Sequence, residues 1–301
     1  MPSATVKKNV PASRRKRRPV SVLRSPALRN LPWLVHGFST REGGTSRCYG
    51  GASLNLGFTK DDARARVEAN RRLFLSEAGA TSGRKAWPLA ALKQIHSDII
   101  HVVRSRANRQ RVGDGLVTNL PGIALAVQTA DCFPVILVDH RNRVVGVFHA
   151  GWRGTAQRIA EKGLGVMRHE YGTLPRDVQA VIGPGIQKCC YTVGEELKGE
   201  FESQFDYAKE LFHEVFVSDP VREKYPLLFM SARAPGHSDF GPQIHLDLAE
   251  ANRRQLLKAG MPAEQISVLA HCTSCETKKF FSHRAEKGVT GRMMAMVGIR
   301  P

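Results

Sequence analysis

The sequence predicts an α/β protein with a mixed sheet. Its 301 residues are 42% hydrophobic and 24% charged, a composition typical of globular proteins and unlike that of collagen or of a wholly disordered chain. Short apolar runs, which are typical of buried strands, recur along the chain. Longer segments with helix start and stop signals alternate with them. No window approaches the roughly 18 apolar residues of a membrane span, so we expect no membrane partner.

Seven apolar runs are the expected strands, at residues 99–103, 123–128, 134–138, 144–149, 178–182, 266–270 and 293–299. Four helices are expected, at residues 61–79, 155–171, 194–205 and 248–259. Turn-forming residues at 139–142 predict a hairpin between two of the strands. Four prolines within 206–245 predict a partly irregular excursion.

The charge is uneven along the chain. Lys and Arg outnumber Asp and Glu by 45 to 27, for a net charge of +18, which by itself suggests a nucleic-acid partner. Nine of the basic residues and no acidic residue lie in residues 1–30. This segment has no apolar periodicity, so we expect it to be a disordered basic tail preceding a folded domain at 31–301. Nucleic acid could then bind only through the tail, and an organelle transit peptide is the alternative interpretation.

The cysteines predict the compartment. The chain has six cysteines and no secretory signal, so a disulfide framework is not expected. We expect a reducing, cytoplasmic setting, in which metal binding, catalysis or burial explains each thiol. The six are Cys48, Cys132, Cys189, Cys190, Cys272 and Cys275.

Polar residues at strand ends mark the candidate site, since α/β proteins place sites there. His96, Cys132 and His149 each follow or end an apolar run. Three such ligands at long spacing suit a catalytic Zn²⁺ that keeps a fourth position open. Two hydrogen-bonded histidines with a buried thiol, or a Cys132 nucleophile with a histidine base, are the alternatives. After His149, a Gly-flanked turn carrying Arg153 predicts an anion site, with simple turn geometry as the alternative.

A second set of thiols has partial zinc-site spacing. Cys272 and Cys275 have the C-x2-C spacing of zinc ribbons, with His271 beside them. Cys189 and Cys190 would complete four ligands, but they are adjacent in the chain. Because neighbouring side chains rarely both turn toward one tetrahedral ion, the adjacency argues against a site here.

Ordered motifs from about residue 31 onward resemble one known family. The motifs are LVHGFSTREGGT at 34–45, SLNLG at 53–57, KQIH at 93–96, GDGLVT at 113–118, TADCFP at 129–134, HAGWRG at 149–154, IGP at 182–184, CY at 190–191, HLDL at 245–248 with AN at 251–252, and TGRM at 290–293. The chain resembles the bacterial purine nucleoside phosphorylase family formerly called polyphenol oxidases or laccase-domain proteins. The segment FSHRA at 281–285 departs from the family's Tyr-Arg-Arg run, and the basic tail is not a family feature.

The resemblance implies a single four-layer α/β/β/α domain with one zinc ion on His96, Cys132 and His149. It also implies phosphorolysis of adenosine, inosine and methylthioadenosine, with adenosine deamination as a second reaction. A copper-dependent phenol oxidation on the same fold is a less favoured alternative, because copper oxidases need more histidines than these. Substrates would be a purine nucleoside and phosphate, and no sequence pattern predicts an oligomeric state.

Four further residues are candidates for the chemistry. Phosphorolysis needs cations that hold phosphate, and Arg41 and Arg153 lie near glycines that permit close approach. Asn55 could hydrogen-bond the sugar or base. Asp131 could carry a proton in catalysis. Each has a structural alternative: surface charges for the two arginines, a turn former for Asn55 and a cap for Asp131.

Overall fold

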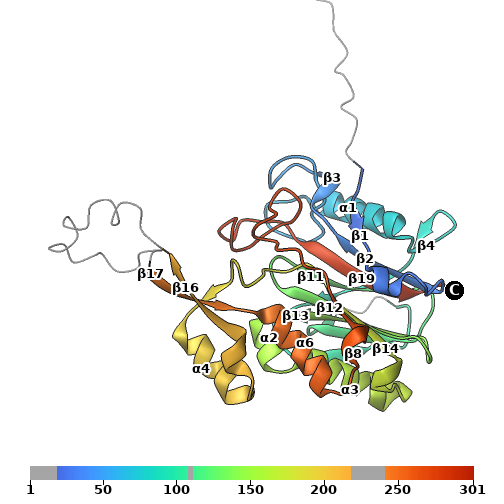
Figure 1. The fold of residues 1–301 in the computed structure, drawn as a ribbon. Helices are drawn as coiled ribbons and strands as arrows, with labels where there is room; N and C mark the ends of the chain where they lie inside the picture. Colours follow the sequence, from blue (N-terminus) through green and yellow to red (C-terminus); the bar gives the residue numbers. More distant parts are fainter. Residues whose placement is uncertain (1–18, 108–110, 218–240) are drawn as a thin grey trace, which may run out of the picture.

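Two β-sheets lie face to face with helices on their outer sides. The computed structural model describes residues 19–107, 111–217 and 241–301. From top to bottom of Figure 1, helix α1 (Arg64–Ala78), a five-stranded sheet, a six-stranded sheet and the helices α3 (Ile159–Tyr171) and α6 (Leu248–Lys258) follow one another. The predicted mixed α/β class is confirmed.

The five-stranded sheet joins the two ends of the described chain. Its strand order is β1 (Val22–Leu23), β2 (Leu34–Ser39), β19 (Met293–Ile299), β11 (Ala124–Thr129) and β6 (Leu89–Ala90). Strand β19 pairs antiparallel with both β2 and β11, whereas β6 pairs parallel with β11. The sheet is therefore mixed, and its central strand is the last one in the sequence.

The six-stranded sheet carries the candidate site at one edge. Its strand order is β18 (Ile266–Val268), β14 (Val178–Ile182), β12 (Phe133–Asp139), β13 (Val144–Ala150), β10 (Gly115–Thr118) and β8 (Ile100–Val102). The predicted hairpin joins β12 to β13, with the Asp139 carboxylate accepting hydrogen bonds from the N–H groups of Arg141 and Asn142 at 2.9 Å.

The central strands are apolar on both faces because both faces are buried. In β12, Val135 and Leu137 pack toward the helices, and Ile136 and Val138 pack toward the other sheet. This alternation follows from the two-residue period of a strand. It explains why these strands appear in the sequence as continuous apolar runs rather than as alternating ones.

Helix boundaries follow local backbone signals. Helix α1 ends at Gly79, whose φ of 85° is left-handed, a conformation that glycine adopts at low cost. Helix α6 begins after Asp247, whose carboxylate accepts a hydrogen bond from the Glu250 N–H and so caps the helix. The single helix expected at 155–171 is instead two helices, α2 (Trp152–Ala156) and α3, because Arg158 between them has a φ of 64°.

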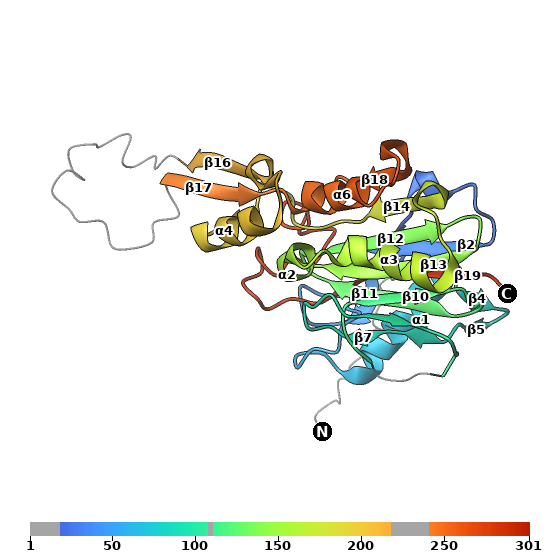
Figure 2. The same cartoon turned by 90° about the horizontal axis from the view of Figure 1, so that it is seen from below.

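Shorter elements complete the described fold. They are β3 (Glu42–Ser46), β4 (Thr81–Ser82), β5 (Lys85–Ala86), β7 (Leu92–Lys93), β9 (Arg111–Val112), β15 (Thr192–Val193), α4 (Glu195–Gln204), β16 (Phe212–Val217) and β17 (Gly241–Leu246). Strands β16 and β17 pair antiparallel and project away from the two sheets in both views (Figures 1 and 2). In the partly irregular excursion expected at 206–245, the two ends are therefore regular strands, and 218–240 lies outside the described residues.

The expected disordered tail at 1–30 is wrong for its last part. Residues 1–18 lie outside the described residues. From Val22, however, the chain forms β1 against β2, and Leu28 is buried in the core between the sheets. Short apolar side chains order this segment because β1 pairs with β2 and because Val22, Leu23 and Leu28 pack against the core. Among the described residues, no helix is long and apolar enough to cross a membrane.

Candidate metal centre

Antiparallel pairing of β12 and β13 brings Cys132 and His149 to the same sheet edge. Cys132 directly precedes β12, and His149 lies one residue before the end of β13. The register pairs Pro134 with His149. Residues that are 17 positions apart in the sequence therefore become neighbours through one hairpin.

His96 reaches the same edge from the loop after β7. Its backbone has a left-handed φ of 60°, a conformation that costs free energy in a residue other than glycine. The Asp114 carboxylate holds this loop, accepting hydrogen bonds from the N–H groups of His96 at 3.1 Å and Ser97 at 2.7 Å. The hydroxyl of Ser97 donates a further hydrogen bond to it at 2.7 Å.

The same carboxylate orients His149. The Nδ1 atom of His149 lies 2.8 Å from Oδ1 of Asp114, which leaves Nε2 as the nitrogen free to bind a metal. This carboxylate–histidine arrangement is the usual support of a metal-binding imidazole. Burial of Asp114 opposes its ionisation, but the hydrogen bonds from His149 and Ser97 outweigh burial and lower its pKa to about 2. Asp114 is therefore a buried anion.

The three candidate ligands converge. The ligand atoms of His96, Cys132 and His149 all lie within 4.8 Å of one another. The Sγ atom of Cys132 is 3.8 Å from Nε2 of His96, and the two imidazole rings are 4.8 Å apart. His149 is buried whereas His96 is exposed, so one side of the centre is open to solvent. Two imidazoles and a thiolate with one open side fit Zn²⁺.

Gly151 leaves the space that this convergence needs. A Cβ atom at position 151 would lie 3.0 Å from the Cys132 Sγ and 3.0 Å from Cδ2 of His96. Both atoms belong to candidate ligands, so a larger residue would require a ligand side chain to move by a few tenths of an ångström. The glycine that follows β13 therefore has a steric role in the centre, beyond that of forming the turn.

Charges at the centre favour a thiolate. Burial opposes ionisation of Cys132, but the neighbouring His149 and hydrogen bonds from both histidines lower its pKa to about 6. For His149, burial favours the neutral form, but Cys132 and Asp114 raise its pKa to about 9. Without a metal, the pair is therefore a thiolate and an imidazolium, and binding a metal requires His149 to lose its proton.

Asp131, directly before Cys132, is held on both carboxylate oxygens. Oδ1 accepts a hydrogen bond from the Thr273 hydroxyl at 2.6 Å, and Oδ2 accepts one from the Arg284 N–H at 2.6 Å. The residue is buried and has a left-handed φ of 85°. These contacts fix the orientation of the Asp131 carboxylate. Its role as a proton carrier stays a prediction.

Arg153 lies on the turn that follows His149 and Gly151. Its guanidinium packs 4.3 Å from the ring centre of Trp152 and is exposed. Among the described residues it has no ion-pair partner. Its positive charge acts on Tyr191 and opposes the rise in the pKa of that hydroxyl. Phosphate binding by Arg153 stays a prediction.

Arg41, in contrast, makes internal contacts throughout. Its guanidinium donates hydrogen bonds to the carbonyls of Thr277 at 2.7 Å and Tyr49 at 2.6 Å. It also pairs with Glu286 at 3.0 Å and stacks on Phe281. Because Glu286 neutralises the positive charge of Arg41, these contacts disfavour phosphate binding by Arg41. Its assignment to phosphate stays a prediction.

Asn55 is fully buried and uses its side-chain amide internally. Nδ2 donates to the Gly57 carbonyl at 3.0 Å and to the Asp62 carboxylate at 2.9 Å. Oδ1 accepts from the N–H groups of Gly57 and Arg292. Nothing of the amide is left for a substrate in this arrangement, so substrate binding by Asn55 also stays a prediction.

Two residues near the centre were missed as site residues. Asp114 lies between two glycines directly before a strand, a signal that could have marked it. Tyr191 is adjacent to Cys190 in the sequence, and its ring lies 5.5 Å from the Arg284 guanidinium. Burial and the charge of Cys132 raise the pKa of Tyr191, so its hydroxyl remains protonated and can donate a hydrogen bond.

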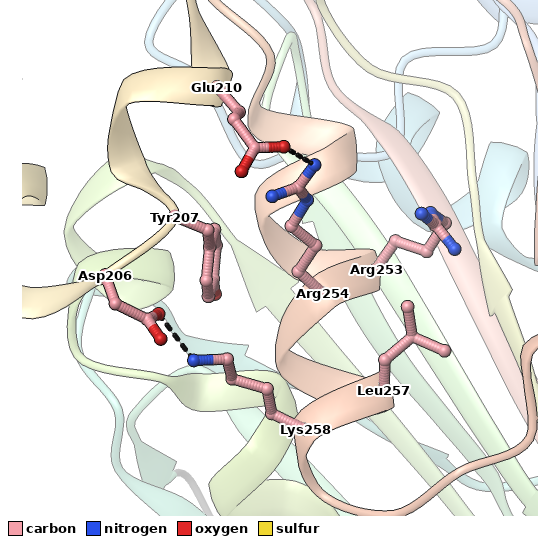
Figure 3. Close-up of a pocket in the computed structure, with 7 residues that line it drawn as sticks. All are labelled: Asp206, Tyr207, Glu210, Arg253, Arg254, Leu257 and Lys258. Atoms are coloured by element: carbon pink, nitrogen blue, oxygen red, sulfur yellow. Dashed lines mark hydrogen bonds and ion pairs between the residues drawn. The ribbon is translucent and has the colours of Figure 1, made fainter.

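A surface pocket lies away from this centre. Figure 3 shows it against α6, and its lining residues are Asp206, Tyr207, Glu210, Arg253, Arg254, Leu257 and Lys258. Two ion pairs cross it, Lys258 with Asp206 and Arg254 with Glu210. Because these charges are paired with each other and none of His96, Cys132 and His149 lines the pocket, the His96 centre remains the candidate functional site.

Fold and site together define a mixed α/β protein with a candidate two-histidine, one-cysteine metal centre. A family model described as multi-copper polyphenol oxidoreductase laccase matches residues 35–300. The chain belongs to this family, and the resemblance noted in the sequence is confirmed.

Proteins of known name are similar over most of their length. Purine nucleoside phosphorylase YlmD of Geobacillus stearothermophilus is 37% identical over 88% of this chain and 90% of its own length. Adenosine deaminase RL5, from an unknown prokaryotic organism, is 33% identical over 83% of this chain and 88% of its own. The crystal structure of the Geobacillus YlmD matches with a TM-score of 0.73 and 34% identity, covering 93% of this chain and 96% of that one.

Proposed function

We propose that the protein catalyses zinc-dependent phosphorolysis of purine nucleosides such as adenosine, inosine and methylthioadenosine. The observation that carries this is the convergence of His96, Cys132 and His149 within 4.8 Å at a solvent-open edge, in a chain similar to proteins named purine nucleoside phosphorylase. A zinc ion bound there would supply a Lewis acid. We favour zinc over copper because these motifs provide only two histidines.

Arg153 is the residue we assign to phosphate. In phosphorolysis, phosphate attacks C1 of the ribose while the purine leaves, and the ribose gains positive charge in the transition state. The anion must therefore be held beside the sugar by a cation that has no other partner. Within the described residues, Arg153 contacts the Trp152 ring but has no ion-pair partner, whereas the Arg41 guanidinium is already paired with Glu286. A held phosphate reacts faster because its position is fixed before the reaction begins.

Adenosine deamination is a second candidate reaction at the same centre. The similarity to a protein named adenosine deaminase RL5 favours it. Deamination exchanges the amino group at C6 of the purine for oxygen from water, so it needs water and a proton carrier rather than phosphate. We propose Asp131 as that carrier, with its hydrogen bonds from Thr273 and Arg284 setting its orientation.

A Cys/His hydrolase is the main alternative. The low pKa of Cys132 beside the imidazolium of His149 is also what a cysteine nucleophile requires. The two hypotheses differ in the response to metal that they predict. An alkylating agent would inactivate a hydrolase with or without a chelator, whereas bound zinc would protect Cys132 until a chelator removes it.

Product analysis by chromatography tests the proposal. Zinc-loaded protein is incubated with adenosine or inosine, with and without phosphate. We expect adenine from adenosine and hypoxanthine from inosine only when phosphate is present. Inosine formed from adenosine without phosphate would indicate deamination. Absence of free base and of inosine in every mixture would contradict the proposal.

We also propose a reducing, cytoplasmic setting for the protein. All six cysteines lie in the described part of the chain and are free thiols. A thiolate ligand at Cys132 requires the reduced state, which that compartment maintains.

A further inference from the structure

A second group of thiols converges away from the His96 centre. The sulfur atoms of Cys189, Cys190, Cys272 and Cys275 all lie within 4.8 Å of one another. The Sγ atom of Cys275 is 3.3 Å from that of Cys190 and 3.6 Å from that of Cys189. We propose that these four thiols bind a structural Zn²⁺ ion, in addition to the metal at the His96 centre.

Adjacency in the sequence does not prevent this arrangement. Cys189 and Cys190 belong to a turn rather than to a strand. Side chains of successive residues point to opposite faces only in a strand, so both sulfurs can approach Cys275 here. The expectation that adjacent cysteines would not both turn toward one ion is therefore wrong for this turn.

The distances suit one ion better than the alternatives. With Zn–S bonds of about 2.3 Å, tetrahedral geometry places sulfurs about 3.8 Å apart. A disulfide needs sulfurs about 2.05 Å apart, whereas the Cys275 sulfur lies 3.3 Å from that of Cys190 and 3.6 Å from that of Cys189. Four soft ligands in one cluster select Zn²⁺ among the common divalent ions.

The backbone around the thiols has the features of a prepared site. The Gln187 N–H points at the Cys272 sulfur at 3.5 Å, an interaction that stabilises a thiolate. The two segments are joined beside the cluster, where the Thr273 N–H donates to the Gly185 carbonyl at 3.1 Å. Cys272 is buried, whereas Cys189 and Cys275 are exposed, so an ion can enter from solvent.

The four-cysteine cluster lies beside the segment that leads into Cys132. Thr273, between Cys272 and Cys275, donates the 2.6 Å hydrogen bond to Asp131. On the opposite segment, the Ile186 N–H donates to the Asp131 carbonyl at 2.8 Å. Asp131 precedes Cys132, so a zinc ion that fixes the two segments also fixes the backbone at one ligand of the first centre.

Metal content of the full-length reduced protein tests the inference. Elemental analysis of zinc-saturated wild-type protein, after removal of unbound metal, should give two zinc ions per chain. Cys275→Ser should give one, and because residue 275 is exposed this change does not disturb the core. The matched control Cys48→Ser alters a cysteine outside both clusters and should retain two. One ion per chain in the wild type, unchanged by Cys275→Ser, would overturn the proposal.

Cobalt substitution provides a readout that does not depend on catalysis. In His96→Ala protein, which lacks a ligand of the first centre, Co²⁺ should still give the absorption bands of a tetrahedral thiolate site. Adding Cys275→Ser should weaken or abolish those bands. Loss of the bands in His96→Ala alone would contradict the proposal. The mass of the metal-free wild-type protein provides a further check. A mass about 2 Da lower for each disulfide would also contradict the proposal, because the cysteines would then form disulfides rather than a zinc site.

Discussion

The carboxylate of Asp114 supports two of the three candidate ligands at once. It lies 2.8 Å from Nδ1 of His149 and accepts the N–H of His96 at 3.1 Å. The two histidines come from different segments, and one buried anion fixes both. The geometry of the centre therefore depends on a residue that does not itself bind the metal.

Replacing this anion should weaken metal binding. We expect Asp114→Asn to lower zinc affinity at the His96 centre by roughly 10- to 100-fold, the usual effect of removing a carboxylate behind a metal-binding histidine. Competition with a chelator, in a Cys275→Ser background that leaves one site, measures this. The matched control is Asp139→Asn, which alters an equally buried aspartate in the β12–β13 hairpin. Asp139→Asn should lower the stability of the protein but leave its zinc affinity unchanged. Equal losses of zinc affinity in the two variants would refute the role of Asp114 as the support of the ligands.

The space at Gly151 gives a second prediction. Gly151→Ala places a Cβ atom 3.0 Å from two ligand side chains, and overpacking of this kind costs about 1–3 kcal/mol. We expect zinc affinity to fall by roughly tenfold or more. Gly165→Ala is the control, because a Cβ atom there meets nothing within 4 Å. It should be neutral or stabilise helix α3 by about 0.5–1 kcal/mol. Unchanged affinity in Gly151→Ala would show that the centre has more room than described.

The phosphate assignment predicts a kinetic effect. Arg153→Gln removes a charged hydrogen-bond donor, and such a bond contributes about 1.5–3 kcal/mol. We expect kcat/KM for phosphate to fall by at least about tenfold, with a smaller effect on zinc content. Arg168→Gln, at another exposed arginine, is the control and should behave as the wild type. If both variants retain full phosphate kinetics, another cation must hold the anion.

The free energy of unfolding should depend on pH through His36, which is not one of the candidate metal ligands. Burial, with a smaller effect of the Arg24 charge, lowers its pKa from 6.5 to about 4, and its Nε2 accepts the Ser25 N–H at 3.0 Å. As the pH falls, the His36 imidazole therefore takes up a proton at a higher pH in the unfolded chain than in the folded one. The contribution of His36 is complete above about pH 6.5 and is lost as pH falls toward 4, by up to roughly 3 kcal/mol.

Denaturant unfolding between pH 7 and pH 4 tests this. The wild type should lose more stability over that interval than His36→Gln, whose amide oxygen can still accept from Ser25 but does not titrate. Parallel pH profiles for the two proteins would mean that other groups account for the whole dependence.

The parts of the fold that the sequence predicted best are those with continuous burial. Strands β14 and β19 were predicted at their observed bounds, because apolar runs of this length have few alternatives. The break between α2 and α3 was not predicted, since the left-handed backbone of Arg158 has no glycine to signal it. Strand β1 was missed because its order comes from pairing with β2, a contact between distant positions.

The candidate site shows the same division. His96, Cys132 and His149 were selected from their residue types at strand ends, and the hairpin register then explains how the last two meet. Roles that depend on contacts between distant residues could not be predicted. The internal partners of Arg41, the support given by Asp114 and the joining of two cysteine pairs all arise only when the chain is folded.

Phosphorus NMR of the reaction between inosine and inorganic phosphate tests the central claim most directly. The account predicts that zinc-loaded protein converts phosphate into ribose 1-phosphate, with one hypoxanthine released for each, and that His96→Ala protein does not. Hypoxanthine released with free ribose while the phosphate signal stays unchanged would contradict phosphorolysis, and full activity in His96→Ala would contradict the metal centre.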